Sequence, residues 1–179
     1  MRIFTLIFFF LLAFATSNAQ KDCNFYKNAA DDFTGKQTVI TKVYRAAGNF
    51  LAGEYFNLVL IREGEDFSVR ITFQSGQIVD KSNIDSTDQL LLKLQNDVVS
   101  LHSRQSYKSQ MMSIGDILIK ALNSDYVVSK ADFQKLVAQS IEKIRYTLDS
   151  GSRVFNFEVN PKNAAKILEG AACVWKTLK

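Results

Sequence analysis

Apolar and polar residues alternate with a period of two through most of the chain between residues 38 and 128. This pattern is typical of strands that bury one face of an antiparallel sheet. The clearest case is Asp66–Phe73, where four apolar side chains share one face and Ser68, Arg70 and Thr72 share the other. The same alternation predicts further strands over Thr38–Tyr44, Glu54–Arg62, Gln89–Gln95, Val98–Ser103, Asp116–Leu122 and Tyr126–Val128.

Short turn sequences separate several of these segments. Glu63–Glu65 contains Gly64, which tolerates positive φ, and therefore predicts a hairpin between its flanking strands. Asn96 and Asp97 predict a second hairpin, and alternation on both sides of Ser150–Ser152 predicts a third. Loops are expected over three polar stretches, Asp80–Asp88, Arg104–Gly115 and Asn123–Asp125.

Helical periodicity is confined to the C-terminal third. Ser129 with Asp132 three residues later resembles a capping box, and apolar positions from Phe133 to Ile144 follow it at helical spacing. A second helix is predicted from Pro161, with Asn160 as its N-cap. Its apolar stripe comprises Ala164, Ile167, Leu168, Ala171, Ala172, Trp175 and Leu178. These elements predict an α+β fold, a mainly antiparallel sheet of hairpins with two helices in the C-terminal third.

Residues 1–19 have the three parts of a secretory signal peptide. A positive start precedes an apolar run over residues 3–15, and small residues lead to a cleavage site after Ala19. The apolar run is shorter than the roughly 20 residues that a membrane-spanning helix needs. We therefore expect removal of this segment, a single domain over residues 20–179, no membrane span after processing, and a secreted or periplasmic location.

The charge of the processed chain is basic but evenly distributed. Removal of the signal peptide takes away one charged residue, Arg2, so 21 basic and 18 acidic residues remain and the net charge is +3. The charges are interspersed and no run of lysine or arginine occurs, which indicates a solvated mixed-charge surface. We expect no nucleic-acid partner.

Two cysteines, Cys23 and Cys173, stand near the two ends of the processed chain. An oxidising destination favours a disulfide, and two cysteines allow only one pairing. The alternative is two unpaired buried thiols. Neither cysteine belongs to a CxxC motif or to a histidine cluster, so the sequence predicts neither a metal site nor a cofactor.

The only histidine is the first candidate for acid–base chemistry. His102 lies in a predicted strand, where alternation places it on one face with Ser100 and places Ser103 on the other. The chain contains no GxSxG or HExxH motif. We therefore assign no catalytic residue and expect His102 to be dispensable.

Two other groups of residues have both a structural and a functional interpretation. Asp80, Asp85 and Asp88 are either solvated loop carboxylates or oxygen ligands for calcium, although their spacing is not that of an EF-hand. The strand phenylalanines either pack in the core or line an apolar cavity beneath a closed sheet. They are Phe56, Phe67, Phe73, Phe155 and Phe157.

Several short motifs carry a resemblance. Cys23 followed by Asp31–Gly35, and the later order of a capped helix, Ile144–Tyr146 and a final helix, resemble uncharacterised small secreted or periplasmic proteins of Bacteroidetes. The resemblance implies an exported α+β domain and supplies no catalytic or binding residues.

The function expected from these observations follows by exclusion. An export signal, an intact core pattern and no catalytic motif predict a non-enzymatic domain that binds a protein or a cell-envelope component. One alternative is a carrier for a small apolar ligand in a cavity under the sheet. The other is a hydrolase with a dispersed carboxylate site.

Overall fold

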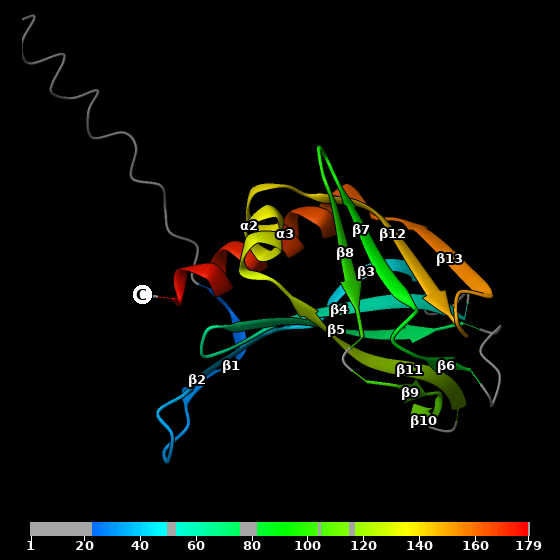
Figure 1. Cartoon of the computed structure of the whole chain (residues 1–179), viewed down its shortest axis with the longest axis horizontal. Coiled ribbons are helices and arrows are strands. Elements are labelled where there is room, and N and C mark those ends of the chain that lie inside the picture. Colours follow the sequence, from blue (N-terminus) through cyan, green and yellow to red (C-terminus); the bar gives the residue numbers. More distant parts are fainter. Residues whose placement is uncertain (1–22, 50–52, 76–81, 104, 115–116, 179) are drawn as a thin grey trace, which may run out of the picture.

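Within the described residues, the strands form two main antiparallel sheets, with two helices at one end (Figure 1). The computed structural model describes residues 23–49, 53–75, 82–103, 105–114 and 117–178. The expected signal peptide lies outside these residues.

The larger sheet has the strand order β1-β2-β4-β5-β11-β10, and β3 pairs with β4 beyond the end of β2. Its strands are β1 (Phe25–Ala30), β2 (Gln37–Thr41), β3 (Tyr44–Asn49), β4 (Glu54–Glu63), β5 (Asp66–Gln74), β10 (Gln110–Ile114) and β11 (Ile117–Val128). The order places β1 at one end of this sheet.

The smaller sheet has the strand order β13-β12-β7-β8. Its strands are β7 (Gln89–Leu94), β8 (Val98–His102), β12 (Ile141–Leu148) and β13 (Arg153–Glu158). Two short strands, β6 (Asn83–Ile84) and β9 (Tyr107–Lys108), pair with each other separately. A bridge between Ser103 and Tyr126 brings the end of β8 next to β11.

Aromatic side chains join the inner faces of the two sheets. Phe56 lies edge-on to Tyr146 with ring centroids 5.5 Å apart, and Phe73 lies 4.7 Å from Phe155 and 5.2 Å from Tyr146. All four rings are buried. Offset and edge-on pairs of this kind add to the stabilisation from apolar burial.

The helices α2 (Lys130–Ala138) and α3 (Pro161–Lys176) pack on each other and close one end of the core (Figure 1). Phe67 of β5 stacks on Phe133 of α2 at 4.3 Å and on Trp175 of α3 at 5.8 Å. The predicted caps are present: the Ser129 hydroxyl accepts the backbone N–H of Asp132 at 3.0 Å, and Asn160 caps α3 in the same way. The predicted mainly antiparallel α+β architecture with two late helices is thus confirmed.

The prediction of one strand over Thr38–Tyr44 was wrong. The chain breaks at Lys42 and Val43 into β2 and β3, which pair with successive parts of the same edge of β4. The break places Tyr44 against α3, where a Cβ atom added to Gly170 would lie 2.2 Å from the tyrosine oxygen. Close packing of the helix therefore requires the glycine.

The predicted loop over Asn123–Asp125 was also wrong, because β11 continues through it. Its polar side chains find partners across the strand pair with β5. The Thr72 hydroxyl donates to Asn123 at 2.6 Å, and Arg70 forms two hydrogen bonds with Asp125 at 2.7 and 2.9 Å. Lateral pairing of this kind lets turn-forming residues stand inside a strand.

Other parts of the prediction also differ from the structure. The first helix ends at Ala138 instead of continuing toward Ile144, because Ile141 already pairs with Leu94 in the smaller sheet. The polar stretches expected to be loops contain β6, β9 and β10. Asp80, Arg104 and Gly115 lie outside the described residues.

Candidate interaction surface

His102 and its neighbouring serines do not form a catalytic arrangement. His102 and Ser100 are exposed on one face of β8 and Ser103 is buried on the other, as the alternation predicts. The Ser103 hydroxyl donates to the backbone carbonyl of Gln105 at 2.6 Å. The hydroxyl is therefore held on the face opposite the imidazole.

The loop that contains Asp85 and Asp88 precedes β7 of the smaller sheet and is bonded to the turn between β12 and β13. Asp88 is fully buried, and its carboxylate accepts backbone N–H groups from Asp85 at 3.0 Å and from Gly151 at 2.8 Å. Asp85 accepts the Ser150 hydroxyl at 2.7 Å and the Thr87 hydroxyl at 2.6 Å. The carboxylates of Asp85 and Asp88 therefore hold two loops together. Asp80, the other residue considered as a calcium ligand, lies outside the described residues.

The hydrogen bonds from Thr87 and then Ser150 lower the pKa of Asp85 to about 2. An aspartate of the unfolded chain has a pKa near 3.9, so the folded state favours the carboxylate. The resulting stabilisation is fully present above about pH 4 and is lost as the pH falls through the folded value.

We therefore expect Asp85→Asn to destabilise the protein at pH 5 and to have a smaller effect at pH 2.5. Urea midpoints of both proteins at the two pH values measure the difference. Asp32→Asn, a change at an exposed carboxylate, is the matched control. A difference between wild type and Asp85→Asn that stays constant over this range would contradict the assignment.

The strand phenylalanines that had two interpretations pack against one another. Phe56, Phe67 and Phe73 are buried, and each contacts other aromatic rings. Phe157 lies 5.6 Å from Phe56 and is partly exposed. Their arrangement is that of a filled core.

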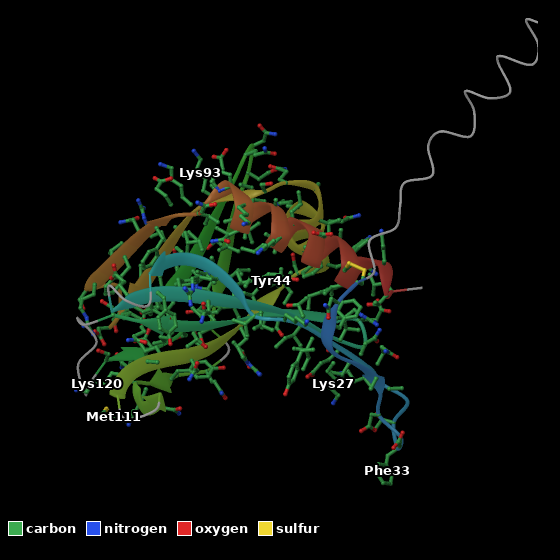
Figure 2. The ribbon with its side chains drawn as sticks, turned by 180° about the vertical axis from the view of Figure 1, so that it is seen from behind. Lys27, Phe33, Tyr44, Lys93, Met111 and Lys120 are labelled. Atoms are coloured by element: carbon green, nitrogen blue, oxygen red, sulfur yellow. A yellow bond between two sulfur atoms is a disulfide. The ribbon has the colours of Figure 1, made fainter. Side chains whose placement is uncertain are left out.

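The most exposed feature of the described chain is the hairpin of β1 and β2, which projects from the body of the molecule (Figures 1 and 2). The sequence pattern did not predict β1. Every residue of β1 after Phe25 is exposed, so the strand has no buried face that alternation would reveal. It pairs with β2 over Phe25–Ala30 and Gln37–Thr41.

The tip of this hairpin, Asp31–Lys36, has an ordered conformation of its own. One carboxylate oxygen of Asp31 accepts the backbone N–H of Thr34 and its hydroxyl, both at 2.7 Å, and the N–H of Phe33 at 3.2 Å. The backbone of Asp31 exchanges two further hydrogen bonds with Gly35 and Lys36. The hydrogen bonds that the carboxylate accepts lower the pKa of Asp31, chiefly the bond from the Thr34 hydroxyl.

Phe33 stands at the end of the tip with 98% of its surface exposed (Figure 2). Tyr26, on the same hairpin, is 79% exposed. A phenylalanine in this position contributes almost nothing to the core, although full burial of its side chain would stabilise a contact by about 1.5–3 kcal/mol. The tip therefore presents an apolar side chain on a loop that is already organised.

A disulfide anchors the root of the hairpin. Cys23, two residues before β1, is bonded to Cys173 of α3, with Cα atoms 5.6 Å apart. The predicted pairing is confirmed, and the alternative of two free thiols was wrong. The bond fixes the start of β1 to the last helix, so the hairpin has one covalently attached end.

A sequence signal for the tip exists but is ambiguous. Asp31, Asp32, Thr34 and Gly35 are turn-forming residues, and their grouping indicates a loop. A phenylalanine at position 33 is equally consistent with a buried core residue. Only the projecting position of the hairpin shows that nothing in the described chain covers its side chain.

Neither α2 nor α3 has the length and apolar character of a membrane-spanning helix. Comparison of the chain with protein-family models, with curated proteins and with solved structures found no match.

Proposed function

We propose that the processed chain is an exported, non-enzymatic binding domain, and that the β1–β2 hairpin is the element with which it contacts a protein partner. The observation that carries this proposal is the exposed Phe33 on a tip held by the Asp31 hydrogen bonds. An apolar anchor that is rigid before binding loses little conformational entropy when it docks.

The hairpin also offers its backbone. β1 is the end strand of its sheet, and an end strand presents N–H and C=O groups that an added strand of a partner pairs with. Such pairing supplies affinity, while the tip side chain supplies specificity. The confirmed disulfide supports a secreted or periplasmic location, because disulfides persist in oxidising compartments.

The two other candidate functions receive less support from the geometry. A carrier needs space between the sheets, and the central rings of Phe56, Phe73 and Tyr146 contact one another there. A hydrolase that works with paired carboxyl groups uses one with a raised pKa as its proton donor. The pKa values of Asp31, Asp85 and Asp132 all move downward.

The proposal is tested by placing a photoreactive phenylalanine analogue at position 33 of the full chain in the cells that export it. Irradiation should give a covalent protein adduct at this position. The matched control is the same analogue at Met111, which is 56% exposed on β10. Absence of an adduct at position 33, or equal adducts at both positions, would overturn the assignment of the hairpin, and the mass of the adduct identifies the partner.

A further inference from the structure

We propose that one partner of the hairpin is a second copy of this chain, and that the tip of one copy docks in a groove on the smaller sheet of the next. This inference rests on the proposed role of the hairpin and names an occupant for it.

The groove extends across strands of the smaller sheet and has an apolar floor. Its lining residues are Leu91, Lys93, Val98, Lys143, Ile144, Arg145, Asn156, Phe157 and Glu158. Its volume is about 260 Å³, somewhat below the roughly 300–1,000 Å³ typical of small-molecule sites. A space of this size and lining suits a single large apolar side chain, such as the exposed phenylalanine of the tip.

The charges of the two surfaces are complementary. The groove is lined by three basic residues and one acidic residue, a net charge of +2. The tip, Asp31–Lys36, contains two acidic residues, Asp31 and Asp32, and one basic residue, Lys36, a net charge of −1. Complementary charges raise the association rate and favour one partner over others.

The hydrogen bond that one of the basic groups makes does not neutralise its charge. Arg145 donates from Nε to the amide oxygen of Asn156 at 2.8 Å, so its partner in this bond is uncharged. Lys143 pairs with Glu158 at 2.7 Å and Lys93 with Glu142 at 3.8 Å, all with largely exposed side chains. Exposed pairs of this kind are weak and exchange readily for another carboxylate.

The positions of the two surfaces exclude an internal contact. Figure 2 shows Phe33 at the far end of the hairpin and Lys93, which lines the groove, on the opposite side of the molecule. A tip that docks in this groove must therefore belong to another copy. Because tip and groove are different surfaces, the contact is head-to-tail, and any assembly that does not close into a ring has a free tip at one end and a free groove at the other.

The test compares two variants that each lack one surface. Phe33→Ser removes the apolar anchor and keeps the groove, whereas Arg145→Glu reverses a groove charge and keeps the tip. For the small interface that one side chain forms, we expect a dissociation constant between about 1 µM and 1 mM in the unaltered protein. Each variant alone should associate at least tenfold more weakly, as measured by sedimentation equilibrium at low ionic strength.

A mixture of the two variants distinguishes a head-to-tail contact from other modes. Phe33→Ser supplies an intact groove and Arg145→Glu an intact tip, so the equimolar mixture should form dimers and stop there. Met111→Ser, which changes an exposed apolar residue elsewhere, should associate like the unaltered protein. Circular dichroism melting of each variant establishes that it is folded. If Arg145→Glu does not fold, Val98→Glu serves as the groove variant in its place.

Two results would overturn the inference. One is an unaltered protein that stays monomeric up to about 1 mM, the upper limit of the expected range. The other is a mixture of the two variants that associates no more than either variant alone. In both cases an adduct at position 33 with a different protein would still support the proposed function, so the two failures are distinguishable.

Discussion

Replacing Phe73 by alanine should lower the free energy of unfolding by about 3–5 kcal/mol, the cost typical of a fully buried phenylalanine. Phe73 is 0% exposed and stands between the two sheets. Its ring contacts Tyr146 at 5.2 Å, Phe155 at 4.7 Å and Phe157 at 5.7 Å. Truncation therefore removes several of the contacts that hold the smaller sheet on the larger one and leaves a cavity at their junction.

The chain supplies a matched control for this substitution. Phe33→Ala deletes the same atoms at a position that is 98% exposed, and it should change stability by no more than about 0.5 kcal/mol. Urea unfolding of both variants measures the contrast. Equal effects of the two substitutions would contradict either the buried junction or the exposed tip.

The sequence predicts the elements whose two faces have different environments. β5 and β8 were found because one face of each strand is buried and the other is not, which imposes a period of two on the sequence. The caps Ser129 and Asn160 were found because each satisfies local N–H groups near it in the sequence. In both cases the structural requirement lies within a few residues of its signal.

The elements that the sequence missed depend on partners distant in the chain. β1 has no buried face, and its backbone pairing with β2 requires no apolar residue. Asn123 and Asp125 are typical of loops but stand inside β11, because Thr72 and Arg70 face them from β5. Likewise the exposure of Phe33 follows from the projection of the whole hairpin, which no local pattern encodes.

Removal of the disulfide, by Cys23→Ser with Cys173→Ser, should destabilise the protein by about 5 kcal/mol according to the loop-entropy model. The bond joins residues 150 positions apart, so it restricts the unfolded chain strongly. For a chain of this size the loss corresponds to a fall in Tm of roughly 10–20 °C. Calorimetry of the oxidised protein, the reduced protein and the double variant measures it, and the last two should agree.

The same variant should loosen one part of the molecule before the rest. The Cys23–Cys173 bond attaches the chain just before β1 to α3. After that point, β1 is held by its hydrogen-bonded pairing with β2. Loss of the bond therefore frees the root of the hairpin, while β4 and β5 remain paired inside the larger sheet. In the double variant the amides of β1 should exchange by local opening, at a rate that does not depend on low concentrations of denaturant, whereas those of β5 should still exchange by global unfolding. Exchange at β1 that follows global unfolding as it does at β5 would show that the disulfide has no particular part in holding the hairpin in place.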